Sequence, residues 1–292
     1  MEGLHRLLAP APACSSLLPG GRKAGSNVTK GRRRGPPAAA AFLAFKGSLT
    51  SSPMPPAIGV LHNLDRDFTG HAGVAIRAAG LELDERRLRA GEPLPALHEV
   101  DGILSLGGDQ SVRDIATDPM LTAEAAFLRE AVEAGLPVFG VCLGAQMVAH
   151  ALGGRVSRLP RRMVEWTPIA PLDAALGDPV TGALPAGAVA LHWNEDGFEP
   201  PPGAVELLAR AGAGAEAFRY GDRVWGVQFH PEVDPEALDG WYVDGTGELD
   251  EAGVTEEQAR AADAAHLPGQ AALSEALFGG FARVVAARSV AA

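Results

Sequence analysis

One cysteine of this chain stands where a strand could deliver it to a tight turn. The stretch FGVCLGAQM, residues 139–147, places Cys142 between Gly140 and Gly144, directly after the apolar run LPVFGV. This G-x-C-x-G pattern is the thiol counterpart of the strand-to-helix turn that presents a nucleophilic serine. The dipole of the following helix favours a thiolate at that position. Taken alone, the pattern leaves two interpretations open, because an isolated cysteine is also commonly a small buried apolar residue.

A histidine and a glutamate near residue 230 could activate such a thiol. His230 and Glu232 stand in the stretch QFHPE, directly after the apolar run RVWGV. An imidazole can take the thiol proton and later give it to a leaving amine, and a carboxylate can fix the ring's tautomer. Pro231 favours an extended backbone at His230, and alternate residues of an extended chain point to the same side. The alternative interpretation is a surface turn that follows an edge strand.

A third pattern, LSLGGDQSV at residues 104–112, places two glycines after another apolar run. Glycines let backbone N–H groups approach a ligand closely, so the N–H of Gly108 could stabilise an oxyanion together with the N–H of Leu143. A Gly-Gly pair seen alone is more commonly an ordinary turn.

Strand-like and helix-like runs alternate along the chain from Pro56 onward. Strands are predicted where short apolar runs end at polar or glycine residues, and helices where apolar residues recur at intervals of three and four. This alternation predicts an α/β fold with a mostly parallel sheet flanked by helices. The predicted strands are 57–61, 80–88, 100–106, 136–141, 187–193, 204–211, 215–221 and 223–229, and the predicted helices are 70–79, 120–135, 143–154 and the segment 235–292.

The first 55 residues differ in composition from the rest of the chain. Residues 1–53 contain eight basic residues and one acid, a net charge of +7, which leaves −18 for the remainder of a chain that totals −11. They are rich in Gly, Pro, Ser and Ala without sustained periodicity, which is typical of a targeting peptide or of a disordered or wrongly assigned extension. We favour an extension that the fold does not need, and assign residues 56–292 to a single domain.

Composition excludes several classes of function. A strongly acidic body is a poor partner for nucleic acid or for an anionic membrane, and no run reaches the ~18 apolar residues of a membrane span. The two cysteines provide neither a disulfide framework nor a zinc cluster. We therefore expect no metal and a reducing, cytoplasmic compartment.

Taken together and in this order, GGDQS, GVCLGAQ and QFHPE resemble the class I, or triad-type, glutamine amidotransferase family. The resemblance covers roughly residues 57–235, and the stretch from LPAGAVALHW to FHPEV is most similar to the GMP-synthase-type domain that occurs as a free-standing protein. It implies a flavodoxin-like layering of sheet and helices with a nucleophile elbow, and no cofactor. The implied substrate is glutamine or another small γ-glutamyl compound.

The resemblance also implies a role for each matching residue. Cys142 would attack the γ-amide and form a γ-glutamyl thioester. His230 would act first as base and then as acid, and Glu232 would orient the imidazole.

Four more residues fall on positions that the family uses to bind its substrate. The N–H groups of Gly108 and Leu143 would hold the oxyanion. Gly107 and Gln146 would help to hold the γ-glutamyl group. Gln146 would contact the α-amino and α-carboxyl groups of the substrate.

Two departures from the family pattern bear on the substrate. Where relatives are expected to read W-H-G-D, this chain reads WNED at 193–196, so that a His and a Gly are replaced in a segment that could line the pocket. The chain also contains no G-x-x-x-x-G-K-[ST] phosphate loop. A synthetase that accepts ammonia would therefore have to be a separate chain.

The remaining alternatives belong to different classes. Hydrolysis of a γ-glutamyl amine, with water as the only acceptor, competes with delivery of ammonia to a synthetase. A non-catalytic binding or regulatory protein on the same fold would predict a degenerate triad, yet all three positions are filled. A cysteine peptidase of the same architecture would need no γ-glutamyl group, and Gln146 with the HPE sequence argues against it.

Overall fold

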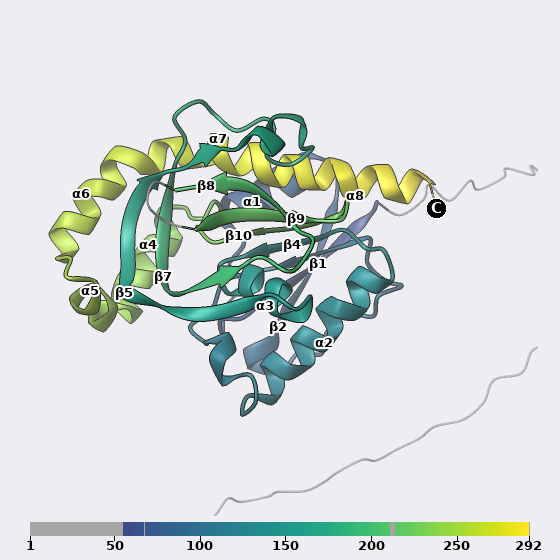
Figure 1. The fold of residues 1–292 in the computed structure, drawn as a ribbon, viewed down its shortest axis with the longest axis horizontal. Helices are drawn as coiled ribbons and strands as arrows, with labels where there is room; N and C mark the ends of the chain where they lie inside the picture. The colour runs from purple at the N-terminus through teal and green to yellow at the C-terminus, as the bar shows by residue number, and fades with distance from the viewer. Residues whose placement is uncertain (1–54, 67, 211–213, 292) are drawn as a thin grey trace, which may run out of the picture. The chain divides into compact units, whose positions relative to one another are not determined.

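The structure is a computed structural model that describes residues 55–66, 68–210 and 214–291. The prediction for residues 1–55 lies, apart from Pro55, outside these described residues. An eight-stranded sheet crosses the described chain (Figure 1). Its strands follow the order β2 (Glu82–Arg87), β1 (Ala57–His62), β3 (Gly102–Ser105), β4 (Val138–Val141), β10 (Val224–Val227), β9 (Ala215–Tyr220), β8 (Val205–Ala209) and β6 (Ala170–Pro171).

The first five strands of this order are parallel, and the remaining pairs are antiparallel. Helices α1 (Gly70–Ala78) and α2 (Pro119–Glu133) connect successive parallel strands, and α3 (Leu143–Ala151) follows β4 directly. The predicted fold class, a mostly parallel sheet flanked by helices, is confirmed. The predicted boundaries of these helices differ from the observed ones by no more than a few residues.

The C-terminal part of the described chain is helical. It comprises α4 (Pro235–Asp244), α5 (Thr246–Ala252), α6 (Glu256–His266), α7 (Gln270–Ser274), the π-helical turn η5 (Glu275–Gly279) and α8 (Gly280–Ala291). Helix α6 begins with a capping box, in which Thr255 accepts from the backbone N–H of Gln258 and the Gln258 side chain accepts from the backbone N–H of Thr255.

The two faces of the main sheet bury separate apolar clusters. Val60 of β1 packs in one cluster with Phe278 of η5, whereas the next residue, Leu61, belongs to the other cluster with Leu128 of α2 and Val148 of α3. Successive side chains of a strand point to opposite faces, so this division follows from the strand geometry. The sheet is therefore covered by helices on both faces, as buried parallel strands require.

A second sheet was only partly predicted from the sequence. It pairs β5 (Arg155–Pro168) with β7 (Val189–Glu199), and β7 extends well beyond the predicted strand 187–193. The sequence analysis assigned no element to residues 155–168, where the structure has β5. Only Met163 and Val164 of β5 are buried, so no two-residue alternation of apolar side chains marks this strand.

Helices α4 to α6 pack on this second sheet. One buried cluster joins the second sheet to these helices. It contains Val164 of β5, Leu191 of β7, Leu238 and Tyr242 of α4, and Leu249 of α5. The second sheet and helices α4 to α6 thus form one packed layer beside the main sheet (Figure 1).

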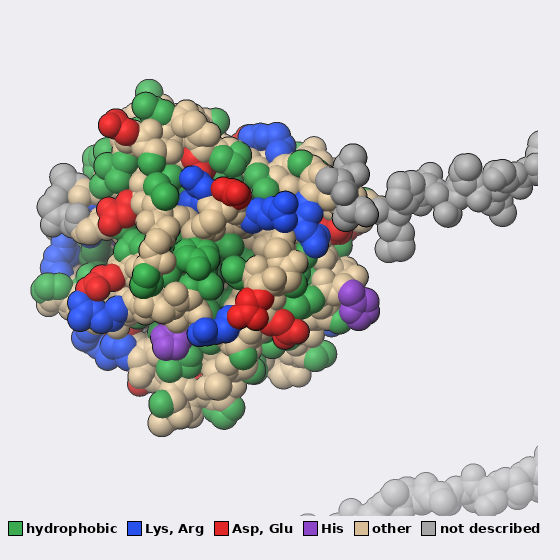
Figure 2. All heavy atoms as spheres, turned by 45° about the vertical axis from the view of Figure 1, so that its right-hand side comes forward, with side chains coloured by type: hydrophobic (Ala, Val, Ile, Leu, Met, Phe, Trp, Pro, Cys, Tyr) green, Lys and Arg blue, Asp and Glu red, His purple; other side chains and the backbone are tan. Residues whose placement is uncertain are grey.

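The surface shows no segregation of charge on the face drawn in Figure 2, where acidic and basic side chains lie next to one another. No helix in the part of the chain that the structure describes has the length and apolar character needed to cross a membrane. Within the same residues, no group of three or more His, Cys, Asp or Glu side chains could hold a metal ion.

Candidate active site

Cys142 occupies a strained turn between β4 and α3. Its φ of 51° makes it the only non-glycine residue with positive φ among the described residues. Such a backbone costs about 1–3 kcal/mol and persists only where the surroundings impose it. The backbone N–H of Cys142 donates to the carbonyl of Val227 at 2.8 Å, which ties the turn to β10.

Two glycines make this turn sterically possible. A Cβ at Gly140 would lie 2.6 Å from the backbone N of Ala145, and a Cβ at Gly144 would lie 2.0 Å from the backbone O of Ser105. Both distances are shorter than any tolerated contact, so neither position accepts a side chain. The glycine spacing observed in the sequence therefore reports the close packing of β3, β4 and α3.

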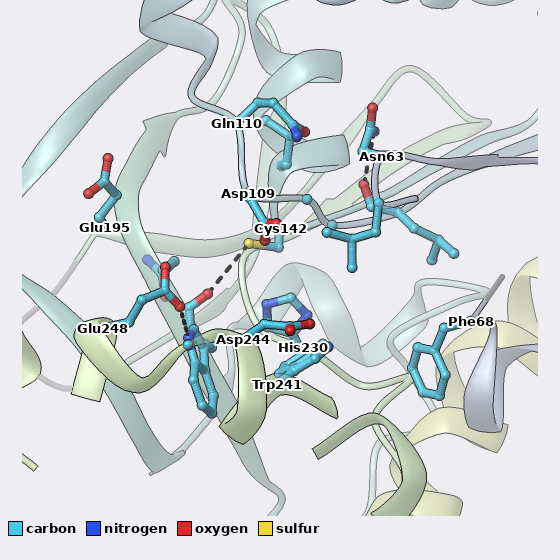
Figure 3. Close-up of a pocket in the computed structure, with 18 of the residues that line it drawn as sticks. Asn63, Phe68, Asp109, Gln110, Cys142, Glu195, His230, Trp241, Asp244 and Glu248 are labelled. Carbon is cyan, nitrogen blue, oxygen red and sulfur yellow. Dashed lines mark hydrogen bonds between the residues drawn. The ribbon is translucent and has the colours of Figure 1, made fainter. Parts of the chain in front are cut away.

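The thiol of Cys142 is buried at the bottom of a pocket. Its side chain is 6% exposed, and Sγ lies 4.0 Å from the carbonyl oxygen of Trp193 on β7 (Figure 3). The side-chain amide of Gln228 donates to Sγ at 3.7 Å. These sulfur contacts are long and weak, which leaves the thiol available for another partner.

His230 and Glu232 are paired beside the cysteine. Nδ1 of His230 lies 2.8 Å from Oε1 of Glu232, and both side chains are buried. The carboxylate fixes the tautomer with the proton on Nδ1 and leaves Nε2 for the thiol. Nε2 is buried and makes no hydrogen bond within the described residues. The ring stands edge-on to Trp241, with the ring centroids 4.7 Å apart.

The electrostatic surroundings favour the protonated form of His230. Burial opposes a charge on the ring, but the Glu232 carboxylate on one side and the Cys142 sulfur on the other outweigh it and raise the pKa of His230 well above its ordinary value of 6.5. A protonated imidazole next to sulfur is suited to stabilise a thiolate and to protonate a leaving amine.

The glycine loop after β3 lies against these groups. A Cβ at Gly107 would meet Cε1 of His230 at 3.1 Å and Cβ of Cys142 at 3.7 Å, so the loop passes close to both residues. Gly108 also lines the pocket, and its backbone makes no backbone hydrogen bond within the described residues. Leu143 is the first residue of α3, where an N–H has no intrahelical acceptor. Both residues thus line the pocket next to Cys142, and the role of their N–H groups at an oxyanion stays a prediction.

A buried polar cluster supports the glycine loop from behind. Glu124 of α2 is fully buried, and its Oε1 accepts from Ser105 Oγ at 2.6 Å and from Asn63 Nδ2 at 3.2 Å. Asn63 Nδ2 also donates to the backbone carbonyl of Leu106. Burial raises the pKa of Glu124, against the opposing effect of these hydrogen bonds. No sequence pattern indicated this cluster, because its members are far apart along the chain.

Gln146 lines the pocket but already uses its donor groups within the protein. Its side chain is buried, and Nε2 donates to the carbonyl of Asp196 at 3.1 Å and lies 3.3 Å from Oε1 of Gln228. Gln146 therefore links α3 to β7 and to the residue that directly follows β10. Its expected contact with the substrate stays a prediction.

The pocket above Cys142 has a volume of about 370 Å³. It contains every residue that the sequence placed at the site: Cys142, His230, Glu232, Gly107, Gly108, Leu143 and Gln146. The WNED segment, residues 193–196, lies on β7 and also lines it. The sequence did not identify the contributions of β5 and α4, among them Arg162, Trp241 and Asp244.

Ion pairs fix most of the charged side chains of the pocket. A guanidinium nitrogen of Arg66 lies 2.5 Å from a carboxylate oxygen of Asp244. The guanidinium nitrogens of Arg162 lie 2.8 Å from a carboxylate oxygen of Glu195 and 2.6 Å from one of Glu248. Asp109, next to Gly108, makes no hydrogen bond or ion pair within the described residues. Partial burial raises the pKa of Asp109, and the nearby Arg66 opposes this effect.

A strained cysteine between a strand and a helix, on a mixed sheet covered by helices, defines an α/β protein with a nucleophile elbow. The fold is similar to that of a glutamine amidotransferase of Thermotoga maritima, with a TM-score of 0.70 over 79% of this chain and 98% of that one, at 22% sequence identity. The chain belongs to the class-I glutamine amidotransferase family, whose family model matches residues 66–244.

The relatives of this chain differ in the activity that their names state. The glutamine amidotransferase-like protein YfeJ of Salmonella typhimurium is 32% identical over 55% of this chain and 69% of its own length. A glutamine-hydrolyzing GMP synthase of Aeropyrum pernix is 34% identical over 52% of this chain, but the match spans only 28% of that longer protein. A gamma-glutamyl-L-1-hydroxyisopropylamide hydrolase of a Pseudomonas species is 29% identical over 55% of this chain and 52% of its own length.

Proposed function

We propose that this protein hydrolyses the γ-amide of a γ-glutamyl compound through a thioester on Cys142. The observation that carries the proposal is the strained backbone of Cys142 at the bottom of the pocket, beside an imidazole whose Nε2 has no partner among the described residues. A core cysteine would not need a positive φ, and a merely structural histidine would have both ring nitrogens hydrogen-bonded.

The first half of the reaction forms the thioester. The sulfur of Cys142 adds to the δ-carbon of the γ-glutamyl amide, and the N–H groups of Gly108 and Leu143 stabilise the negative oxygen. His230, which took the thiol proton, gives it to the amide nitrogen. The C–N bond then breaks, and ammonia or an amine leaves.

The second half regenerates the enzyme with water. His230 accepts a proton from a water molecule, whose oxygen adds to the thioester carbonyl. The C–S bond breaks, the sulfur recovers the proton, and glutamate is released. The Glu232 carboxylate holds the imidazole in one orientation in both halves and compensates its positive charge.

A second candidate function is delivery of the ammonia to a separate synthetase chain. It is favoured by the similarity to glutamine-hydrolyzing GMP synthases, of which the Aeropyrum pernix protein is one. The chemistry at Cys142 is the same in both functions, and only the acceptor of the released ammonia differs.

The test is a comparison of substrates with the purified chain. Ammonia or amine release is measured from glutamine, a γ-glutamyl alkylamide, a γ-glutamyl dipeptide and the α-linked isomer of that dipeptide. Turnover of γ-linked amides alone supports the proposed function. Cleavage of the α-linked isomer indicates a peptidase, and glutamine turnover that appears only when a synthetase is added indicates the second candidate.

Glu232→Gln is expected to lower kcat about 10²- to 10⁴-fold, because the imidazole loses its orientation and its counter-charge. The pH profile should change as well. Formation of the thioester needs the proton that His230 and Cys142 share, so kcat/KM falls as pH rises through the pKa of His230, which Glu232 holds well above 6.5. In the variant this alkaline limb should move to lower pH.

The measurement for Glu232→Gln is the pH dependence of kcat/KM on a γ-glutamyl alkylamide. Glu133→Gln, at an exposed position at the end of α2, is the matched control and should keep the original profile. An unshifted alkaline limb in Glu232→Gln would contradict the assigned role.

A further inference from the structure

The lining of the pocket carries more negative than positive charge. Six carboxylates, two guanidinium groups and the imidazole of His230 line it. The carboxylates belong to Asp109, Glu195, Asp196, Glu232, Asp244 and Glu248, and the guanidinium groups belong to Arg66 and Arg162. Glu232 pairs with His230, and Asp196 and Glu195 also pair with Arg113 and Arg158 from outside the lining, which leaves Asp109 as the lining carboxylate without a cationic partner among the described residues. Figure 3 shows Asp109, Glu195, Asp244 and Glu248 around Cys142 and His230.

The two guanidinium groups are already engaged by carboxylates. Arg66 pairs with Asp244, and Arg162 pairs with Glu195, Glu248 and, outside the pocket, Glu251. Neither arginine is therefore available to attract an anionic ligand without breaking these pairs.

The carboxylate of Asp109, unlike the two guanidinium groups, has no oppositely charged partner among the described residues. No ion pair or hydrogen bond holds its carboxylate within the described residues, although partial burial makes an unpaired charge unfavourable there. It directly follows Gly108, whose N–H we assign to the oxyanion. A charge at Asp109 therefore acts close to the amide that is cleaved.

Buried acceptors beneath the pocket surface lack donors as well. Nδ2 of Asn194 donates to the carbonyl of Asp196 at 2.9 Å, which fixes the amide and leaves Oδ1 without a partner among the described residues. Oε2 of Glu232 is also buried and has no hydrogen-bond donor among the described residues. Each such oxygen is more stable with a donor, from a ligand or from water.

The γ-glutamyl group of the substrate has no net charge with which to balance the carboxylate of Asp109. Its α-ammonium and α-carboxylate cancel, so the net charge of the substrate depends on the amine that leaves. Trp193 and Trp241 also line the pocket, and aromatic rings attract organic cations.

We propose that the pocket selects γ-glutamyl amides whose leaving amine carries a second, protonated amino group, with Asp109 as the principal counter-charge. This inference rests on the proposed function and names the substrate class of the same site. An aliphatic ammonium has an ordinary pKa near 10, so such a substrate is cationic at neutral pH.

The test compares three γ-glutamyl amides of similar length that differ in terminal charge. They are the 4-aminobutylamide (cationic), the pentylamide (neutral) and the amide of 4-aminobutyrate (anionic). We expect kcat/KM to decrease in that order, with a cationic-to-neutral ratio on the order of fivefold or more for a partly exposed ion pair. High salt should reduce the ratio.

Asp109→Asn removes the charge with little change in shape. The cationic-to-neutral ratio of kcat/KM should fall about fivefold, toward one, mainly through KM of the cationic amide. Asp222→Asn is the control, because this exposed carboxylate just after β9 lies outside the pocket but changes the net charge equally. It should leave the ratio unchanged.

Equal rates for the three amides, a preference for the anionic amide, or an unchanged ratio in Asp109→Asn would overturn the proposal. Calorimetric binding of the same amides to Cys142→Ala separates it from the proposed function. Charge-ordered binding without wild-type turnover would refute the hydrolysis and keep the selectivity. Turnover that does not depend on the charge of the leaving amine would support the hydrolysis and refute the selectivity. Binding that does not depend on this charge would refute the selectivity whether or not the wild type turns the amides over.

Discussion

Cys142→Ala is expected to lower kcat on γ-glutamyl amides at least about 10⁴-fold, to the level of the background reaction. No other thiol or hydroxyl side chain belongs to the described residues that line the pocket, so the variant keeps no substitute nucleophile. The oxyanion N–H groups and the pocket remain in place. Substrate binding should therefore persist while the thioester cannot form.

The measurement for Cys142→Ala has two parts. Amine release is followed at saturating substrate, and mass spectrometry of the wild-type chain, quenched during turnover, tests for a glutamyl adduct on Cys142 that the variant lacks. Cys142→Ser provides a second control, because a hydroxyl keeps the shape of the side chain but is a much weaker nucleophile at neutral pH. Residual turnover of Cys142→Ala within about tenfold of wild type would exclude the thioester mechanism.

Gly144→Ala is expected to lower the free energy of unfolding by about 3 kcal/mol or more. The added Cβ would lie 2.0 Å from the backbone oxygen of Ser105. Ser105 pairs with Gly140 in the main sheet, so this oxygen cannot move away without disturbing β3 and β4. The clash involves backbone on both sides, and no rotation of a side chain relieves it.

Thermal and urea unfolding measure this effect, with Gly247→Ala as the matched control. Gly247 lies in α5, and a Cβ there would meet no atom within 4 Å. Alanine is the better helix former, so this control should be neutral or slightly stabilising. For a domain of this size the loss in Gly144→Ala corresponds to a fall in Tm of about 6 °C or more. An unchanged Tm would mean that α3 does not pack on β3 as described.

The parts of the site that are local in sequence were predictable. Gly140 and Gly144 mark the elbow because two backbones approach each other there, and a short-range steric rule is sufficient for this feature. The pairing of His230 with Glu232 was also predicted, but not its backbone: Pro231 and Glu232 lie in a turn after β10 instead of an extended strand. The alternation of apolar runs likewise predicted the parallel half of the sheet.

The charged lining of the pocket was not predictable in this way. Arg162 comes from β5, a strand without an alternating apolar pattern, and Asp244 and Glu248 come from α4 and α5. Their convergence depends on how the second sheet packs against those helices, which no local pattern encodes. The same holds for Glu124 and Asn63, which meet across 61 positions of the chain.

The two sheets contribute different parts of the pocket. The turn that carries Cys142 belongs to the main sheet, whereas residues 193–196 and Arg162 belong to the pair β5–β7. Under the proposed function, exchanges on β5 and β7 can therefore change which amine is accepted while the turn that carries the thiol is kept. In evolutionary terms, one reaction could be kept across descendants of this chain while the compounds it acts on diverge.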